Sequence, residues 1–441
     1  MRRARCEGDI VTQEPTGGVP TLEPFAPLTG TRVLEWATGA AGPFTAKALA
    51  ALGADVIKIE PPLVGDETRH EGPFPGDVPD PEQSALFLFL NNDKRSITLD
   101  PATGDGRALL RRLIIEWADL LIEDQQPASL EAMGLTYEAL SAEKPALVMV
   151  SITPFGQDGP YRDFQMLPSQ TSHAGGAAYV MPDGFHYSDA YVDGAPPPMQ
   201  WPRYVSDNSV GVLAAGGAVA ALLVADSIGR GQHVDVSKQE AQMHLLRYSV
   251  DAFGNTGENN KRRGNATGSL AGTYQCADGW ISVWPGGFGP RGPGFESDPT
   301  LDLADWLGNP EWSLTEAWRD PEQRKLRAVE YQSLLQQEFM RYTMDEIFYG
   351  LQERDFVVAP VYAVQHALAS EQYKARGFFQ WVQDDGAGRI PYPVLPFKVS
   401  GASDRVPGTA PSLGEHTSEV LAGVLGMGQP EHAQLRSLGV I

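Results

Sequence analysis

The chain has 441 residues and a marked excess of acidic side chains, because 56 Asp and Glu oppose 34 Lys and Arg and give a net charge of −22. Hydrophobic residues make up 42% of the chain, which is typical of globular proteins and excludes a fibrous or disordered class. The acidic balance opposes nonspecific binding to nucleic acid or to an anionic membrane, since both require Lys and Arg. Two cysteines, Cys6 and Cys276, cannot build a disulfide framework, so we expect a reducing, cytoplasmic location.

Two segments bear on targeting and membranes. Residues 1–27 mix Glu, Thr, Pro and Gly and predict a flexible N-terminal arm, without the apolar segment of a secretory signal. The longest apolar run, 210–225, is shorter than the roughly 20 residues that a spanning helix needs. Because this run is rich in Ala and Gly, it predicts a helix buried in a core or at a subunit interface.

The first ordered unit is a β-α-β pattern. Residues 31–36 and 54–60 have the branched, apolar character of strands, and 44–52 has the composition of a helix, with Pro43 suited to its first position. Strands predicted at 119–123 and 147–152 alternate with helices predicted at 106–117 and 137–143. This alternation predicts an α/β fold with a parallel sheet and right-handed crossovers.

The pattern changes after residue 231. We expect a short strand at 232–237, a helix at 240–252, two strands within 274–284, a long helix at 322–340 and a closing helix at 415–425. The predicted organisation is an arm (1–27), the first part of a large domain (28–230), a linker (231–253), a smaller α+β middle domain (254–350) and a segment that returns to the large domain (351–441).

Common site motifs are absent from the sequence. There is no Walker-type phosphate loop, no GxGxxG at the first helix, no GxSxG and no His or Cys pair with metal-ligand spacing, so no metal is expected. The loop at 38–43 is the one generic candidate, because backbone N–H groups at a helix start can bind an anion. A tight strand-to-helix turn explains the same residues equally well.

Several segments, taken in order, carry a resemblance to a known family. They are LTGTRVLE at 28–35, LGADVIKIEPP at 52–62, NDKRSITLD at 92–100, FGQDGPY at 155–161, GRGQ at 229–232 and LGEHT at 413–417. In this order and spacing the chain resembles the family III CoA-transferases, which include formyl-CoA transferase, the carnitine-CoA transferases and the α-methylacyl-CoA racemases.

The resemblance implies a fold and a chemistry. Family members have a Rossmann-like large domain formed from both chain ends and a smaller middle domain, and two subunits interlock as a dimer. Their catalytic aspartate attacks an acyl-CoA thioester, and the resulting mixed anhydride and enzyme–CoA thioester pass CoA to an acceptor acid. The implied co-substrates are a CoA thioester and a small carboxylic acid, with no covalently bound cofactor.

At the position of this aspartate the chain departs from the family pattern. Counting from GPY at 159–161, the aspartate position holds Pro168, which can serve neither as nucleophile nor as acid or base. Ser169, His173 and Asp163 are candidates to replace it, with His186 and Asp189 in the following loop. The competing interpretation, which the residue types favour, is that these are ordinary loop and helix-start residues.

The resemblance also implies CoA contacts. They fall on Ala40, Ala41, Lys94, Arg95, Leu99, Asp124 and Met133, and a glycine-rich active-site loop of the small domain corresponds to Gly264, Asn265 and Gly268. Asp124 stands in a segment where the family usually has Glu-Asn-Phe, and a carboxylate facing the nucleotide would repel its phosphates. Ala132 stands where an arginine is common. The sequence therefore predicts altered CoA handling.

Three hypotheses remain open at this stage. The chain is a CoA-transferase with nonstandard catalysis, or a non-catalytic subunit paired with an aspartate-bearing paralogue, or a repurposed thioester hydrolase, acyltransferase or epimerase. The first and third are compatible with a homodimer, whereas the second requires a heterodimer. None of them involves nucleic acid or a membrane.

Overall fold

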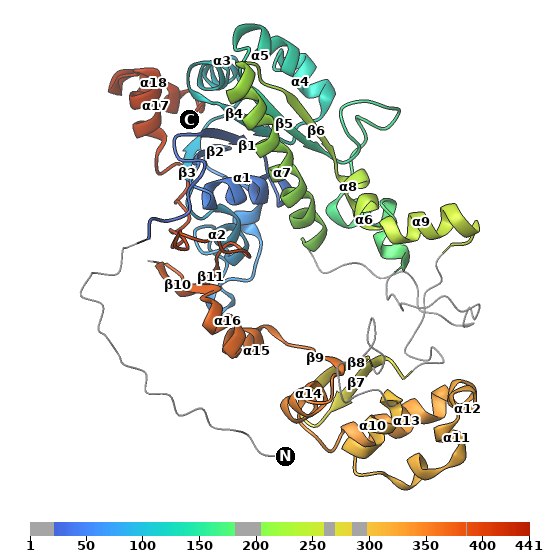
Figure 1. The fold of residues 1–441 in the computed structure, drawn as a ribbon. Helices are drawn as coiled ribbons and strands as arrows, with labels where there is room; N and C mark the ends of the chain where they lie inside the picture. Colours follow the sequence, from blue (N-terminus) through green and yellow to red (C-terminus); the bar gives the residue numbers. More distant parts are fainter. Residues whose placement is uncertain (1–21, 181–203, 260–269, 285–297, 385) are drawn as a thin grey trace.

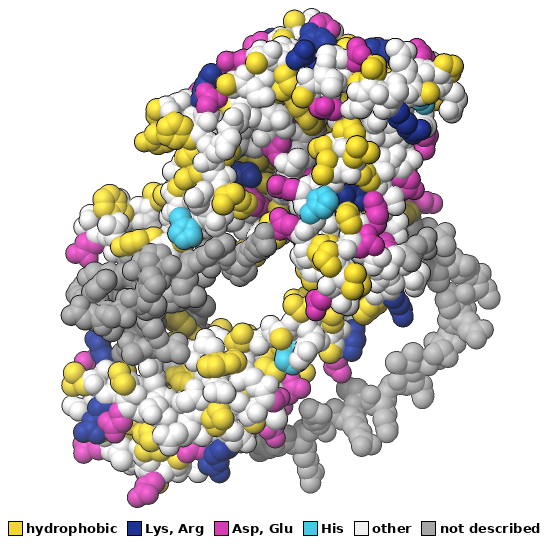
Figure 2. Space-filling view, turned by 180° about the vertical axis from the view of Figure 1, so that it is seen from behind, with side chains coloured by type: hydrophobic (Ala, Val, Ile, Leu, Met, Phe, Trp, Pro, Cys, Tyr) yellow, Lys and Arg dark blue, Asp and Glu magenta, His cyan; other side chains and the backbone are white. Residues whose placement is uncertain are grey.

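The computed structural model describes residues 22–180, 204–259, 270–284, 298–384 and 386–441. Figure 1 shows a larger α/β part and a smaller domain formed by β7–β9 and α10–α14. The connection on one side runs through α15 (Val364–Ala369) and α16 (Glu371–Arg376). In the space-filling view of Figure 2, an opening separates the two parts near the middle of the molecule.

A six-stranded parallel sheet forms the centre of the larger part, in the order β3-β2-β1-β4-β5-β6. Its strands are β1 (Arg32–Trp36), β2 (Asp55–Glu60), β3 (Arg95–Thr98), β4 (Leu120–Glu123), β5 (Val148–Thr153) and β6 (His233–Ser237). The order runs outward from β1 in both directions, so β1 and β4 are the adjacent strands whose connections leave toward opposite edges. The predicted α/β class with a parallel sheet is confirmed.

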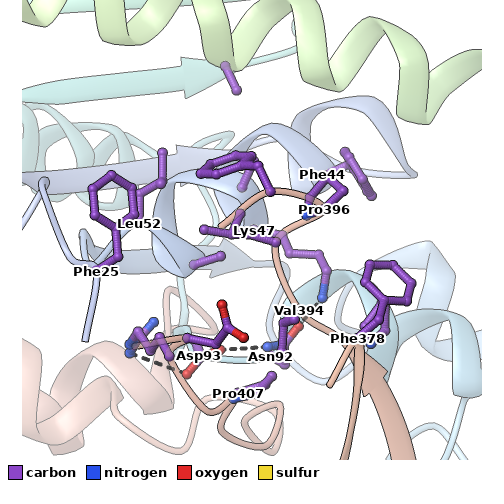
Figure 3. Close-up of a pocket in the computed structure, with 18 of the residues that line it drawn as sticks. Phe25, Phe44, Lys47, Leu52, Asn92, Asp93, Phe378, Val394, Pro396 and Pro407 are labelled. Carbon is purple, nitrogen blue, oxygen red and sulfur yellow. Dashed lines mark hydrogen bonds and ion pairs between the residues drawn. The ribbon is translucent and has the colours of Figure 1, made fainter. Parts of the chain in front are cut away.

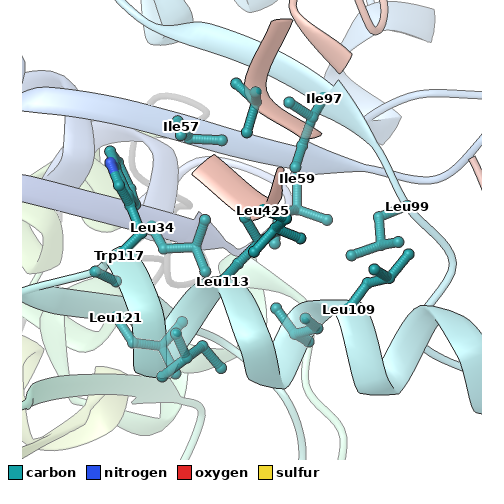
Figure 4. Close-up of a cluster of buried hydrophobic side chains, with 14 of the residues drawn as sticks. Leu34, Ile57, Ile59, Ile97, Leu99, Leu109, Leu113, Trp117, Leu121 and Leu425 are labelled. Carbon is teal, nitrogen blue, oxygen red and sulfur yellow. The ribbon is translucent and has the colours of Figure 1, made fainter. Parts of the chain in front are cut away.

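Both faces of the sheet are buried because successive side chains of a strand point to opposite faces. On β1, Leu34 joins one apolar cluster and Val33 joins the other. Figure 4 shows the first cluster, in which Leu34 and Ile57 of the sheet pack near Leu113 and Trp117. Two layers of helices therefore enclose the sheet.

The helices of the larger part divide between these two faces. The helices and turns that precede β6 are α1 (Ala41–Ala51), η1 (Glu67–His70), η2 (Pro75–Asp77), α2 (Ala85–Asn91), α3 (Gly104–Arg112), the π-turn η3 (Leu113–Trp117), α4 (Pro127–Met133), α5 (Tyr137–Glu143), α6 (Pro168–Ala174), η4 (Ala177–Val180) and α7 (Val205–Ile228). Those that follow are α8 (Lys238–Leu245), α9 (Arg247–Thr256), α17 (Thr417–Leu425) and α18 (Gln429–Ser437). The cluster of Figure 4 contains residues of α3, η3, α17 and α18, whereas α1 and α7 contribute to the opposite cluster.

The smaller domain has its own antiparallel sheet and its own core. Its strands are β7 (Gly272–Cys276), β8 (Gly279–Trp284) and β9 (Val357–Pro360), paired in that order. Its helices are α10 (Pro299–Trp306), η5 (Glu311–Leu314), α11 (Glu316–Arg319), α12 (Pro321–Leu326), α13 (Ala328–Phe339) and α14 (Met344–Gln352). Trp318, Leu335 and Phe339 are fully buried in its apolar cluster.

The C-terminal segment returns to the larger part. The hairpin of β10 (Phe379–Asp384) and β11 (Gly388–Pro393) lies against α2, where the Tyr392 hydroxyl donates to the Leu88 carbonyl at 3.3 Å. Residues ahead of α17 then reach the sheet edge, and the Thr98 N–H donates to the Thr417 hydroxyl at 2.9 Å. Near the other end of the described chain, the Phe25 N–H donates to the Ser403 carbonyl at 3.0 Å, so residues 22–27 are tied to this segment.

Several element boundaries differ from the sequence-based prediction. Helix α1 begins at Ala41, two residues before Pro43, and the expected helix at 322–340 is divided at Arg327 between α12 and α13. The segment 231–253, expected as a linker, holds the sixth sheet strand and α8. Strand β9 pairs with β8, so the sheet of the smaller domain extends past residue 350.

Helix α7 also differs from expectation, because it spans 24 residues and is long and apolar enough, by length and composition, to cross a membrane. In the fold it packs on the sheet: Ala214 and Ala218 are fully buried, and Gly211 lies so close to α1 that a Cβ there would be 2.9 Å from the Ala41 carbonyl. The opposite face of α7 is exposed, with Leu223 at 65%.

Candidate active site

The candidate site lies at the carboxyl ends of β1 and β4. In an open α/β sheet, ligands bind in the crevice at the carboxyl ends of the strands where the strand order reverses. Here the loop after β1 (Thr38–Ala40) and the residue after β4, Asp124, meet at that point. The predicted Ala40 and Ala41 are buried at the N-terminus of α1, where the N-cap has no side-chain hydrogen bond.

The carboxylate of Asp124 accepts the hydrogen bond from the N–H group that a bound anion would otherwise use. Its carboxylate accepts from the Thr38 N–H at 2.8 Å and lies 3.3 Å from the Thr38 hydroxyl. Burial raises the pKa of Asp124 to about 6, because the hydrogen bond from Thr38 and the nearby Lys238 offset only part of the desolvation. A carboxylate of the chain therefore stands where a phosphate would approach this loop.

A second carboxylate and one cation adjoin the loop. A Cβ on Gly39 would lie 3.0 Å from Glu67 Oε1, and partial burial, with Asp66 and Glu71 nearby, raises the pKa of Glu67. Lys238, the first residue of α8, lowers the pKa values of both Glu67 and Asp124 and forms an ion pair with buried Asp207 at 3.3 Å. The site thus combines carboxyl groups of raised pKa with one amine.

Glu123, at the end of β4, is a fully buried carboxyl group directly beside this site. The Gln125 N–H donates to its Oε2 at 2.7 Å, Ser151 is its side-chain partner, and burial raises the pKa of Glu123 to about 8. The Ser151 hydroxyl also contacts His233 Nε2 at 2.8 Å, and the His233 ring stacks on Tyr137. Glu123 is therefore held in its neutral form at pH 7.

A buried ion-pair network supports the loop from beneath. Lys58 Nζ lies 2.8 Å from Glu35, 2.7 Å from Asp66 and 2.9 Å from the Ala37 carbonyl. Lys94 Nζ lies 2.7 Å from the other oxygen of Glu35, and it also donates to the Pro43 carbonyl and Asn91 Oδ1. The three ammonium protons of Lys94 have acceptors within the protein, so this predicted phosphate ligand serves the network instead.

Pro168 is the first residue of α6, a position that suits proline because its missing N–H has no helical partner. The candidate replacements for the aspartate are engaged elsewhere. His173 Nδ1 contacts the Ser169 main-chain carbonyl, and within the described chain no hydrogen bond joins the Ser169 hydroxyl to His173. Asp163 accepts from the Ala128 N–H in the first turn of α4 at 3.1 Å and pairs with Arg162.

The remaining predicted contacts are scattered. Arg95 lies at the start of edge strand β3, where it pairs with Asp55 at 2.7 Å, whereas Leu99 is buried in the core and Met133 packs against its rim. Gly264, Asn265, Gly268, His186 and Asp189 lie outside the described residues. The structure thus brings Ala40, Ala41 and Asp124 together, with Lys94 in the buried network beneath the loop, and it places Arg95, Leu99 and Met133 apart from the loop.

Sequence reasoning missed Glu67, Lys238, Glu123 and His233. A positional signal was available for two of them: Glu123 ends a predicted strand and Lys238 directly follows one, and in a parallel sheet both positions fall at the ligand-binding edge. Glu67 had no such signal because it comes from a loop. Among the described residues no group of three His, Cys, Asp or Glu side chains could hold a metal ion.

Comparisons with known proteins agree on a family. The model of CoA-transferase family III matches residues 28–417. The chain is 30% identical to the succinyl-CoA–D-citramalate CoA-transferase of Chloroflexus aurantiacus, covering 95% of this chain and 99% of the relative. It is 32% identical to the succinyl-CoA:(R)-benzylsuccinate CoA-transferase subunit BbsE of Thauera aromatica, covering 87% and 91%. A solved CAIB/BAIF family protein from Brucella suis has a TM-score of 0.77 at 29% identity, covering 90% and 99%.

Proposed function

Because this chain belongs to CoA-transferase family III, we propose that it transfers CoA between an acyl-CoA and a carboxylic acid without an enzyme-bound acyl aspartate. The observation that carries this proposal is Pro168 at the first position of α6. A proline side chain has no atom that can attack a thioester, and the engaged state of Asp163 and His173 supports the same conclusion for its neighbours.

The chemistry balances without a protein nucleophile. The carboxylate of the acceptor acid attacks the thioester carbonyl, which forms a mixed anhydride and releases the CoA thiolate. The thiolate then attacks the carbonyl of the acceptor half, which gives the new thioester and frees the donor acid. Holding both reactants at the sheet edge supplies the effective concentration that this route needs, and the charge of Lys238 lowers the pKa values of the carboxyl groups there.

The sheet supports this placement of the reaction. Its strand order, 3-2-1-4-5-6, is the one found in Rossmann folds, whose ligands lie across the β1–β4 junction. The acidic groups at this junction, Asp124 and Glu67, disfavour a phosphate at the Thr38 loop. We therefore infer that the CoA phosphates lie elsewhere and that its pantetheine end approaches the junction.

An interlocked dimer is the assembly that the family resemblance implies, and two features support it. The exposed face of α7 carries a stripe of apolar side chains at helical spacing, in which Leu213 is 38%, Leu223 65% and Val224 36% exposed. A monomer seldom leaves such a face on a long apolar helix uncovered. The opening in Figure 2 offers a place for a second chain.

The test is an exchange assay. Purified protein is incubated with succinyl-CoA and isotope-labelled acids, and label entering the CoA thioester pool is followed by mass spectrometry, with hydroxylamine added in parallel. We expect exchange with at least one acid and capture of the acyl group as a free hydroxamate. No exchange with any acid, or a hydroxamate on a protein carboxyl group, would contradict the proposal. Pro168→Asp is the matched variant, and it should add a protein-bound hydroxamate.

A second candidate function is that of a subunit in a heteromeric CoA-transferase. It is favoured by the 32% identity to BbsE, which is described as a subunit of its enzyme. In that case a related chain supplies the aspartate. Affinity purification from the native host should then recover an aspartate-bearing family member in equal amount, and exchange should require both chains. Full activity of the purified homodimer would refute this alternative.

A further inference from the structure

A cavity of about 370 Å³ lies in the larger part of the molecule, and none of the residues of the β1–β4 junction line it. It is enclosed by the second half of α1, the end of α2, one turn of α7 and the return segment after β11. Its walls are mainly aromatic and aliphatic, and Figure 3 labels Phe25, Phe44, Phe378 and Val394 among them. Phe89 and Phe397 also line the cavity. The size falls within the range of small-molecule sites, roughly 300–1,000 Å³.

One buried amine faces this apolar cavity. Lys47 of α1 is 9% exposed, its Nζ donates to Asn92 Oδ1, and it lies 4.6 Å from the Phe89 ring centroid and 5.6 Å from that of Tyr392. Among the described residues no carboxylate forms an ion pair with Lys47. A buried ammonium group without a counter-anion is unfavourable by several kcal/mol, and two ring faces offset only part of this.

The charged side chains near Lys47 already form ion pairs with other residues. Asp93 pairs with Arg405 at 3.3 Å and accepts from the Gly408 N–H at 2.8 Å, while Lys94 pairs with Glu35. Burial, with the charge of Lys94, lowers the pKa of Lys47 to about 7, against the smaller effect of Asp93. The cavity therefore offers an apolar volume and one amine that is available to an added anion.

We propose that this cavity binds a small apolar carboxylic acid, whose carboxylate pairs with Lys47 and whose hydrocarbon part packs against the surrounding phenylalanines. Among the described residues the amine has no ion-pair partner, its one hydrogen-bond acceptor is the Asn92 amide oxygen, and most of the other lining residues are apolar. No residue of the candidate active site lines this cavity, so the proposal stands apart from the transferase reaction.

Octanoate and octan-1-ol form the matched pair of probes, because they share the hydrocarbon chain and differ in charge. Isothermal titration should show one octanoate per chain, bound at least tenfold more tightly than octan-1-ol at pH 7. Binding should be accompanied by proton uptake at pH 8, since the carboxylate restores the proton of Lys47, and it should weaken as the pH rises. Equal affinity for the two probes, or no proton uptake, would overturn the proposal.

Variants distinguish the contribution of the Lys47 amine to binding from that of the apolar walls. Lys47→Met should weaken octanoate binding at least tenfold and leave octan-1-ol unchanged, whereas Lys47→Arg should retain most octanoate binding. Lys374→Met removes an exposed lysine of α16 that does not line the cavity, and should change neither. Unchanged octanoate binding by Lys47→Met would refute the role of the amine. The wild-type proton uptake decides the question if that variant fails to fold.

Discussion

Replacing Lys58 by Met tests the buried network that holds the loop after β1. Lys58 and its partners Glu35 and Asp66 are at most 1% exposed. The substitution keeps the length of the side chain but removes its charge. The buried carboxylate of Asp66 then keeps only its hydrogen bonds from the N–H and the hydroxyl of Thr68. Glu35 keeps its contact with Lys94.

The expected loss of stability in Lys58→Met follows from this loss of an ion-pair partner. Removing one partner of a buried ion pair costs about 3–5 kcal/mol, because the other charge stays in a low-dielectric site. Burial alone would lower the pKa of Lys58, yet the charges of Asp66 and Glu35 raise it. Exposed pairs are worth far less, about 0.2–1 kcal/mol. Arg112→Met, which breaks the exposed pair with Glu116, is therefore the matched control.

Hydrogen exchange followed by mass spectrometry is the assay, because peptides covering β1 and β2 report the larger part separately from the smaller domain. Lys58→Met should lower the opening free energy of these peptides by about 3–5 kcal/mol at pH 7, and Arg112→Met by under about 1 kcal/mol. Lys58 also lowers the pKa of Asp66, although burial acts in the opposite direction. The stability that this shift confers is present above the unfolded pKa and is lost as the pH falls.

The opening free energies of wild type and Lys58→Met should consequently become more similar as the pH falls, because the variant already lacks the contribution that the wild type loses on acidification. A cost equal to that of Arg112→Met would refute the reasoning. So would a difference that grows on acidification.

Three further predictions concern other groups. Burial raises the pKa of Glu123 to about 8. The wild type should therefore lose stability between about pH 4.5 and 8, because the unfolded chain releases a proton that the folded chain keeps. Thermal melts of Glu123→Gln should lack this loss, and melting temperatures of the two proteins that change with pH in parallel would contradict it. Asp124→Asn removes the charge that disfavours a phosphate at the Thr38 N–H, so the variant should admit the CoA phosphates to this loop. Native mass spectrometry and titration should then show CoA binding that is roughly tenfold tighter, for about 1.4 kcal/mol of repulsion removed, whereas weaker binding would show that the carboxylate assists CoA. Leu335→Ala should destabilise the smaller domain by about 2–5 kcal/mol in urea unfolding followed by tryptophan fluorescence, with exposed Leu326→Ala as the control that should change little.

Much of the larger part could be predicted from the sequence because its strands are short apolar runs separated by amphipathic helices. Helix α5 occupies the residues predicted, 137–143, since Thr136 caps its start by accepting from the Ala139 N–H. The division of 322–340 could not be read from the pattern. Buried Arg324 of α12 donates to the Trp318 carbonyl and to Asp298, which lies 26 residues away in the chain, so the position of α12 depends on tertiary contacts.

The site was less predictable, because its groups come from separate loops. Asp124 was identified through the family resemblance, but its hydrogen bond to the Thr38 N–H depends on the pairing of β1 with β4. Lys94 was expected to contact a phosphate, but it pairs with Glu35, whose carboxylate bridges Lys58 of β2 and Lys94 directly before β3. The composition of α7 predicted a helix buried in a core or at a subunit interface, and it could not show which face of the helix is exposed in the single chain.

The most direct test of the central claim compares CoA exchange by the wild type and by Pro168→Ala, using succinyl-CoA and the labelled acid that reacts fastest. If catalysis proceeds without a group at position 168, both proteins should exchange CoA at rates within about twofold, and neither should carry an acyl group that hydroxylamine captures on the protein. An acyl group captured on a protein side chain of either one, or the absence of exchange by the wild type with every acid, would contradict the account.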